Sequence, residues 1–329
     1  MQKVAVIGAG KMGTTHAKAY AAMPNAELVA ICDTRPDAAE ELAGTYSARA
    51  YTAIEQALKE IEVDAVDICT PTPTHIDYIK IAAAAGKHIC CEKPLTRSIS
   101  QAMEAARICE EAGVTLFPAH VVRWFPEYRR LRDLITSGSI GETVEVRATR
   151  GGKARLGVDS WYANMQMSGG VVLDLLVHEF DWLRWCYGNV RRVYGKGLYG
   201  SRMPGIDYAL VTLRFDNGVI AHVEGNWARP SGFAASVEVA GTQGLLHWRN
   251  TQSRPLVIER RLNDGATAEE APVASLAAID PYYQELEHFI TCLDEGRAPD
   301  VTPQDGIEAV RICEAALRSI STGEPVTLA

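Results

Sequence analysis

Two polar side chains of complementary chemistry stand in an otherwise apolar stretch of the chain. The segment 169–183 reads GGVVLDLLVHEFDWL and places Asp174 four residues before His178. Residues at this spacing share one face of an α-helix, so a helix here would present a carboxylate and an imidazole together. An imidazole accepts a proton near neutral pH, which makes His178 a candidate general base. A solvated helix face is the alternative interpretation of the same spacing.

A lysine follows an apolar run that is typical of a buried strand. The segment 88–95 reads HICCEKPL, and Lys93 comes directly after its strand-like part. An ammonium group stabilises a developing alkoxide, and ligands of open α/β sheets collect where the strands end. Lys93 and His178 together predict oxidation of a secondary alcohol, a reaction that removes a proton as hydride leaves. Asp174 would bind the substrate or orient the base.

A glycine-rich turn opens the chain. Gly8, Gly10 and Gly13 follow the strand-like VAVI and precede a helical stretch. In a dinucleotide fold these glycines allow the tight turn, the close approach of a pyrophosphate and the packing of helix on strand. The helix N-terminus then offers free N–H groups to the phosphates. A flavin site, a nucleotide-sugar site or a purely structural turn are the alternatives.

The choice of dinucleotide depends on two residues after the next strand. Asp33 stands 20 residues beyond Gly13, where a carboxylate accepts hydrogen bonds from ribose hydroxyls. It would repel a 2′-phosphate, which favours NAD. Arg35 could grip such a phosphate or stack on the adenine, so NADP stays possible.

The elements needed to position these residues are visible in the periodicity. Short β-branched runs alternate with helical stretches over the first 120 residues, which predicts a parallel sheet covered on both faces. The strands are expected at Val4–Ile7, Leu28–Ile31, Ala65–Cys69, His88–Cys91 and Val114–Phe117. The helices between them are expected at Met12–Met23, Thr74–Ala85 and Ile99–Ala112.

In the remainder of the chain, the predicted helices and strands no longer alternate regularly. A helix at Pro126–Ser137 and a strand at 142–149 precede the apolar segment, and a run of strands follows from Val190 to Leu262. That run includes a hairpin around Asp216-Asn217-Gly218. Two helices, Tyr282–Glu295 and Pro303–Ser321, close the chain. We therefore expect an α/β protein with a Rossmann domain over 1–120 and a second domain over 121–329.

Several motifs in a fixed order resemble one family. They are Gly8-Ala9-Gly10-Lys11-Met12-Gly13, the turn Thr70-Pro71 to His75, Glu92-Lys93-Pro94, and Gly169-Gly170 followed by Asp174 and His178. Over essentially its whole length the chain is similar to the Gfo/Idh/MocA oxidoreductases, which include glucose-fructose oxidoreductase and inositol 2-dehydrogenase. The family usually has three glycines before the helix, whereas this chain has Ser168 in the first of these positions.

The resemblance implies hydride transfer between NAD or NADP and a secondary alcohol of a sugar or cyclitol. It implies that 121–329 is a substrate-binding and oligomerisation α/β domain, with an open, predominantly antiparallel sheet that pairs copies into a homodimer or homotetramer. By the same resemblance Lys93, Asp174 and His178 are catalytic. The implied cofactor-binding residues are Gly8, Gly10, Lys11, Met12, Gly13, Asp33, Arg35, Thr70, Pro71, His75, Glu92 and Lys93.

Three residues are weaker candidates for contact with substrate. Arg123 begins the second domain, although an ion pair would explain it as well. Tyr162, beside Trp161, could form a wall for a sugar or pack in the core. Tyr282, or Tyr283 next to it, lies in a segment that resembles one that can reach the substrate in relatives.

Composition and charge limit the partners, the cellular location and the metal content that the sequence predicts. The net charge is −8 and no basic run occurs, so neither nucleic acid nor an acidic membrane surface is an expected partner. The first ten residues read as a strand and not as a signal peptide, so we expect a cytoplasmic protein. The eight cysteines show no zinc-ligand spacing, and no metal is expected. An NAD-dependent glycosidase with transient oxidation and a non-catalytic cofactor sensor remain as alternative functions.

Overall fold

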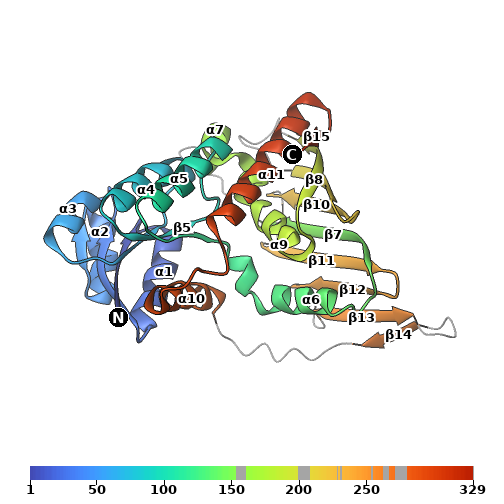
Figure 1. Cartoon of the computed structure of the whole chain (residues 1–329), viewed down its shortest axis with the longest axis horizontal. Coiled ribbons are helices and arrows are strands. Elements are labelled where there is room, and N and C mark those ends of the chain that lie inside the picture. Colours follow the sequence, from blue (N-terminus) through green and yellow to red (C-terminus); the bar gives the residue numbers. More distant parts are fainter. Residues whose placement is uncertain are drawn as a thin grey trace. The chain divides into compact units, whose positions relative to one another are not determined.

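The chain divides into two units. A computed structural model describes residues 1–152, 161–198, 208–227, 229, 232–252, 255–261, 267–270 and 280–328 (Figure 1). The first unit comprises Met1–Trp124 and Ala278–Val310, and the second comprises Phe125–Ala277 and Arg311–Ala329. A late segment of the chain thus belongs to the same unit as the N-terminus.

The first unit contains a six-stranded sheet. Its described strands all pair in parallel, in the order β3-β2-β1-β4-β5-β6. This is the doubly wound order, and its strand sequence reverses between β1 and β4, where such sheets bind ligands. The strands are β1 (Gln2–Ile7), β2 (Ala26–Cys32), β3 (Arg49–Tyr51), β4 (Ala65–Ile68), β5 (His88–Glu92) and β6 (Leu116–Ala119).

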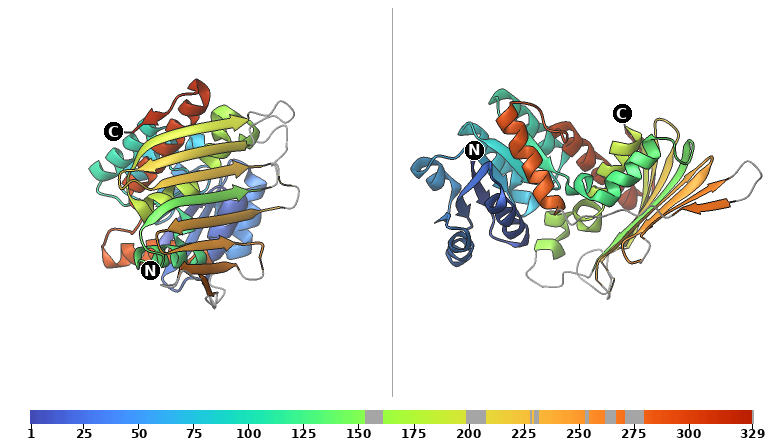
Figure 2. Two further views of the ribbon diagram at one scale, coloured as in Figure 1. Left: turned by 90° about the vertical axis from the view of Figure 1, so that its right-hand side faces the viewer. Right: turned by 90° about the horizontal axis from the view of Figure 1, so that it is seen from below.

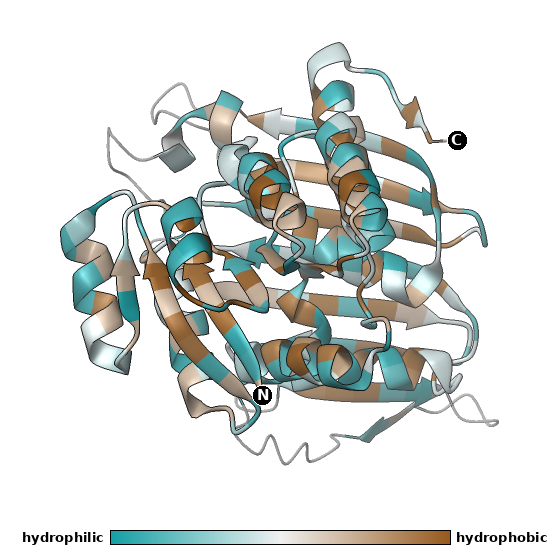
Figure 3. Cartoon of the chain, turned by 60° about the vertical axis from the view of Figure 1, so that its left-hand side comes forward, coloured by the Kyte–Doolittle hydropathy of each residue, from teal (hydrophilic) through white to brown (hydrophobic). Residues whose placement is uncertain are grey.

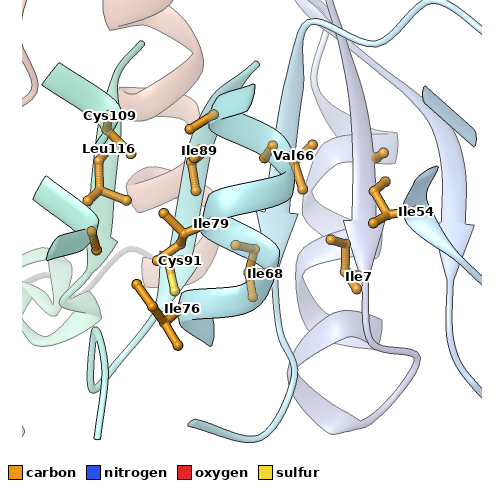
Figure 4. Packing of buried hydrophobic residues seen from close by; sticks show 14 of the residues in the cluster. Ile7, Ile54, Val66, Ile68, Ile76, Ile79, Ile89, Cys91, Cys109 and Leu116 are labelled. Atoms are coloured by element: carbon orange, nitrogen blue, oxygen red, sulfur yellow. The ribbon is translucent and has the colours of Figure 1, made fainter. Parts of the chain in front are cut away.

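Both faces of this sheet are buried. Successive side chains of a strand point to opposite faces, so β1 sends Ala5 and Ile7 into one apolar cluster and Val4 and Val6 into another. Figure 4 shows part of the first cluster, in which Ile7 lies among isoleucines from neighbouring elements. The helices of this unit are α1 (Lys11–Ala22), α2 (Pro36–Tyr46), α3 (Ile54–Glu60), α4 (His75–Ala84), α5 (Ile99–Glu111) and α10 (Pro281–Glu295), with 3₁₀ turns η1 (Thr72–Thr74) and η2 (Val121–Trp124).

The second unit contains a nine-stranded sheet. Its order is β14-β13-β12-β11-β7-β10-β9-β8-β15, and β7 pairs with β10 in parallel while the other pairs are antiparallel. The strands are β7 (Thr143–Gly151), β8 (Val190–Leu198), β9 (Tyr208–Phe215), β10 (Ile220–Asn226), β11 (Ala234–Gly241), β12 (Gly244–Arg249), β13 (Leu256–Arg261), β14 (Thr267–Glu270) and β15 (Val326–Thr327). The expected hairpin is β9–β10, and Gly218 in its turn has a φ of +92°.

Helices lie against one face of this sheet. The helices of this unit are α6 (Pro126–Thr136), α7 (Met165–Ser168), α8 (Gly170–Asp174) and α9 (Val177–Tyr187), with η3 (Trp161–Ala163) before α7. The helix α11 (Pro303–Thr322) begins in the first unit, and its part from Arg311 onward belongs to the second. Buried and exposed residues alternate along β9, as expected for a sheet with one solvated face. Figure 3 shows the corresponding alternation of hydrophilic and hydrophobic residues along the strands. Among the described residues no helix crosses the outer face (Figure 2, left).

The fold class predicted from the sequence is confirmed. Each of the five expected strands of the first sheet is present, and the three expected helices between them differ by one residue or so at their ends. β3 was not expected, because three residues are too short for a periodic signal. Within the described residues, no helix combines the length and the apolar character needed to span a membrane.

Candidate active site

The glycine turn connects β1 to α1 by contacts that tolerate no side chain. Gly8 has a φ of +102°, and a Cβ there would lie 2.7 Å from the carbonyl oxygen of Cys69. A Cβ on Gly13 would lie 1.7 Å from the carbonyl oxygen of Gly8. The helix therefore passes directly against the turn. Both glycines are required by the fold itself, whether or not a ligand is bound.

Gly10 is different, because the protein does not need it to be glycine. Its φ of −82° suits any residue, and a Cβ there would meet nothing within 4 Å. Gly10 is also the N-cap of α1, with no side-chain hydrogen bond to the first turn. The first N–H groups of a helix have no acceptor within the helix. Open space in front of such donors fits a dinucleotide pyrophosphate.

The Asp33 side chain connects the glycine turn to the backbone of Arg35, two residues further along the chain. Its Oδ2 accepts the N–H of Ala9 at 2.8 Å, and its Oδ1 accepts the N–H of Arg35 at 2.9 Å. The Arg35 guanidinium also donates to both oxygens, at 3.1 Å each. Burial raises the pKa of Asp33, but the bonds from Arg35 and Ala9 outweigh it and leave the pKa lowered. Arg35 thus pairs with the carboxylate that was expected to hold the ribose.

The loops after β4 and β5 are tied together by a buried histidine. His75 Nε2 lies 2.9 Å from the carbonyl oxygen of Thr70, and its Nδ1 lies 3.1 Å from that of Pro94. Burial is the main cause that lowers the pKa of His75, so the ring is neutral and donates to one carbonyl at a time. The structure therefore gives His75 a role in fixing these two loops. Pro71 belongs to the loop after β4 and lies immediately before η1.

Lys93 lies directly after β5, at the carboxyl edge of the first sheet. Its side chain is partly buried, and its backbone N–H donates to Glu92 Oε2 at 2.9 Å. The Lys93-Pro94 peptide bond is cis. Lys93 and the glycine turn occupy the same edge, because the carboxyl ends of parallel strands lie together.

Asp174 and His178 belong to the second unit and lie on two helices. α8 ends at Asp174 and α9 begins at Val177, so the prediction of one continuous helix is wrong. The N–H of Leu176 bonds to the carbonyl of Val171, five residues back, which is a π-type turn. Leu176, which lies in this break, packs so closely on β10 that a Cβ on Gly225 would clash with its side chain.

The surroundings of these two residues are part solvent and part protein. Asp174 and His178 are both partly exposed, whereas Asp181, three residues after His178 on α9, is only 1% exposed. A simple solvated helix face therefore does not describe this segment. Next to His178, the Glu179 carboxylate is buried and pairs with the Arg150 guanidinium of β7. This ion pair fixes α9 against the sheet.

Ser168, which replaces a family glycine, has a structural task. Its side chain is buried, and its Oγ accepts the N–H of Gly170 at 3.0 Å. The same hydroxyl is 3.0 Å from the carbonyl oxygen of Tyr162, to which it donates. Gly169 next to it has a φ of +70°. The serine thus connects η3 to the start of α8.

The weaker candidates are distributed over both units. Arg123 is 4% exposed and forms an ion pair with Asp305 at 3.2 Å. The ring of Tyr162 stacks on that of Trp161 with centroids 4.0 Å apart. The ring of Tyr282, on α10, lies 6.2 Å from that of His16 on α1. Tyr282 is therefore near the edge of the sheet that carries Lys93.

The sequence interpretation missed a buried polar cluster in the first unit. His16 Nδ1 lies 2.8 Å from Asp67 Oδ2 and 3.3 Å from Cys69 Sγ. The sequence feature that could have indicated this cluster is Asp67, an acidic residue within the apolar run of β4. Its partner came from α1, a separate element, so spacing along the chain did not reveal the pair.

Comparison with known proteins agrees with this architecture. Residues 2–120 match the model of the oxidoreductase family with an NAD-binding Rossmann fold, GFO/IDH/MocA, and residues 128–247 match the GFO/IDH/MocA C-terminal domain. The chain is 31% identical to inositol 2-dehydrogenase of Rhizobium meliloti over 98% of both chains. It is 30% identical to the uncharacterized oxidoreductase YrbE of Bacillus subtilis over 98% of this chain and 95% of that protein.

A solved structure extends the similarity to three dimensions. The crystal structure of GenD2 from gentamicin A biosynthesis, in complex with NAD, has a TM-score of 0.88 and 26% identity. The alignment covers 100% of this chain and 96% of that one. The chain therefore belongs to the GFO/IDH/MocA family of oxidoreductases, whose first domain is an NAD-binding Rossmann fold.

The different surroundings of Gly10 and Gly13 yield a prediction. Gly10→Ala should fold normally, with a cost of at most about 1 kcal/mol for an alanine N-cap, yet weaken NAD binding at least about tenfold, or 1.4 kcal/mol. Gly13→Ala should lose stability, because its Cβ has no space beside Gly8. Thermal unfolding and NAD titration calorimetry measure the two effects. Unchanged NAD affinity in a folded Gly10→Ala variant would contradict the close approach.

Proposed function

We propose that the chain is an NAD-dependent dehydrogenase that oxidises a secondary alcohol of a sugar or cyclitol. The observation that carries the proposal is the position of Lys93 on the same sheet edge as the glycine turn. Ligands of doubly wound sheets bind at this edge. The similarity to inositol 2-dehydrogenase supports a polyol of the inositol kind as substrate class.

The cofactor would lie along the first unit. The glycine turn and the N-terminus of α1, with Lys11 and Met12, would hold the pyrophosphate, and Asp33 the ribose. Thr70, Pro71, His75 and Glu92 belong to the loops and strand end of the same edge. Bound NAD supplies the acceptor for the hydride that leaves the alcohol carbon.

Lys93 and His178 would have different roles when the alcohol loses its proton. The Lys93 ammonium donates a hydrogen bond to the alcohol oxygen and stabilises negative charge as it develops there. His178 in its neutral form accepts the hydroxyl proton. Asp174 binds a neighbouring hydroxyl or orients the imidazole. Arg123, Tyr162 and Tyr282 are proposed to contact the substrate, Tyr162 through the stacked pair it forms with Trp161.

The outer face of the nine-stranded sheet is proposed to pair copies into a homodimer or homotetramer. Tyr194, Leu198 and Leu210 are exposed there by 36%, 70% and 39%, which is unusual for large apolar side chains on neighbouring strands. We place the protein in the cytoplasm. No nucleic acid, membrane or metal enters this proposal.

The first prediction concerns the choice of cofactor. Asp33→Ser removes the charge that repels a 2′-phosphate and releases Arg35 to bind one. NAD affinity should fall by about tenfold or more, the value of a hydrogen bond to a charged group, while NADP affinity rises relative to it. Asp37→Ser, which removes an exposed carboxylate on α2, should change neither affinity. A wild type that prefers NADP tenfold would show that Asp33 is misassigned.

The second prediction tests the reaction with a panel of polyols. Myo-inositol, scyllo-inositol, glucose and xylose are offered with NAD, and NADH is followed at 340 nm. At least one should be oxidised by the wild type. Lys93→Met should lower kcat by about 10²–10³, as loss of an oxyanion donor does, with little change in NAD affinity. A variant that keeps a third of wild-type kcat with chemistry rate-limiting would remove Lys93 from the reaction.

The same assay tests His178 through the pH dependence of the oxidation rate. Oxidation by the wild type should rise with pH as the base loses its proton. His178→Ala should abolish this rise and lower kcat by about 10²–10⁴, while NAD still binds. A folded His178→Ala variant with the turnover and pH profile of wild type would return His178 to a structural role.

A further inference from the structure

Three charged side chains meet inside the first unit, next to the proposed catalytic lysine. His16 comes from the buried face of α1, Asp67 from β4, and Glu92 from the last position of β5. His16 and Asp67 are 0% exposed and Glu92 is 6% exposed. Charged groups are seldom buried to this degree unless they are paired.

The imidazole of His16 lies between the two carboxylates. Its Nδ1 is 2.8 Å from Asp67 Oδ2, and its Nε2 is 3.3 Å from Glu92 Oε1. The first contact is a hydrogen bond and the second is an ion-pair contact. Since a carboxylate faces each ring nitrogen, the arrangement is electrostatically consistent when both nitrogens carry protons and the ring is an imidazolium.

The pKa shifts agree with this charge assignment. Burial opposes protonation of His16, but the charge and hydrogen bond of Asp67 outweigh it, with Cys69 adding to the effect, and raise the His16 pKa well above its usual value. Burial raises the pKa of Glu92, yet His16 and Lys93 bring it below normal. The thiol of Cys69 has a raised pKa, mainly because it is buried, and stays neutral. Burial and the nearby Asp67 carboxylate raise the pKa of the buried Tyr20 hydroxyl of α1, which stays neutral. The helix α10 brings the ring of Tyr282 to His16.

A metal ion does not explain the cluster as well. His16, Asp67 and Cys69 offer ligand atoms within 4.8 Å of one another. Two ligand atoms on a tetrahedral zinc ion, at about 2.0–2.1 Å from it, would be about 3.3 Å apart. The 2.8 Å between His16 Nδ1 and Asp67 Oδ2 is a hydrogen-bond distance instead.

Glu92 connects this cluster to Lys93. While Oε1 faces His16, Oε2 accepts the backbone N–H of Lys93 at 2.9 Å. We propose that His16 is a positioning residue, a buried imidazolium that keeps Glu92 ionised and oriented so that Glu92 holds the Lys93 backbone in place. This inference rests on the role proposed above for Lys93. It assigns His16 no contact with substrate or cofactor.

Loss of the imidazolium would change the state of Glu92. A buried carboxylate that has lost its counter-charge gains a proton at higher pH, and a protonated carboxyl is a weaker acceptor for the Lys93 N–H. In a His16→Leu variant the Lys93 backbone is therefore less well held at neutral pH. Turnover should recover as the pH rises and Glu92 ionises, which gives an additional acid limb in the pH profile of kcat.

The charge of His16 can be measured without any activity. In ¹H–¹³C NMR spectra of the histidine rings, the His16 resonance, assigned by its loss in His16→Gln, should report an imidazolium at pH 7, because its pKa is raised. In Asp67→Asn the same ring should lose its proton at a lower pH. A His16 ring that is neutral at pH 7 in the wild type overturns the proposal. This readout stands even if the proposed dehydrogenase reaction fails.

Kinetics test the link to Lys93, with myo-inositol and NAD as the probe pair. His16→Leu should lower kcat by about tenfold or more, the value of one hydrogen bond to a charged group, with NAD affinity near that of wild type. His16→Gln, whose amide donates to only one carboxylate, should recover part of the loss. His88→Leu makes the same substitution at the other end of β5 and should leave kcat and its pH profile unchanged.

The outcomes separate the two proposals. A folded His16→Leu variant with wild-type kcat and pH profile overturns the positioning role. Full activity of Lys93→Met overturns the proposed function but leaves the NMR result on His16 intact. If His16→Leu does not fold, His16→Gln and the NMR titration decide, because each keeps a polar side chain at this position.

Discussion

The approach of α1 to the glycine turn is the constraint on which the first unit depends. The Gly13 Cα lies so near the Gly8 carbonyl that no Cβ fits between them. Because the helix starts this close to the sheet, its N-terminal N–H groups lie beside the carboxyl ends of the strands. The same placement brings His16, one turn further along the helix, to Asp67 and Glu92. One backbone contact thus places both the helix end that is proposed to bind the cofactor and the histidine that is proposed to position Lys93.

The two units contain different arrangements of buried charged side chains. In the first unit the buried carboxylates of Asp67 and Glu92 face a single imidazolium, and the arrangement ends at the Lys93 backbone. In the second unit the buried Glu179 pairs with Arg150, immediately beside His178. Buried ion pairs contribute little net stability, because desolvation offsets their attraction, but breaking one leaves a costly uncompensated charge. Their value here is that they define the orientation of the residues next to them.

The sequence was sufficient to predict elements whose signal is local. The glycine turn, five of the six strands of the first sheet and the β9–β10 hairpin have signals in residues adjacent in the chain, and all are present. The family resemblance was likewise carried by short motifs and is confirmed. The roles of Lys93, Asp174 and His178 stay predictions, since geometry within each unit does not test them.

Features that depend on contacts between distant elements were not predictable. The break between α8 and α9 lies where Leu176 packs on Gly225, which belongs to a strand far along the chain. The His16 cluster gathers residues from α1, β4 and β5, and no spacing rule connects them. The pairing of Arg35 with Asp33 is local, yet it depends on side-chain conformation and not on residue type alone.

The most direct test of the account follows the hydrogen atom. Myo-inositol deuterated at its carbinol carbons is incubated with the enzyme and NAD, and the product NADH is analysed by mass spectrometry and ¹H NMR. The account predicts NADH with one deuterium at C4 of the nicotinamide and a slower single turnover than with unlabelled substrate. NADH that lacks deuterium, or glycoside cleavage without net NADH in place of polyol oxidation, would contradict it.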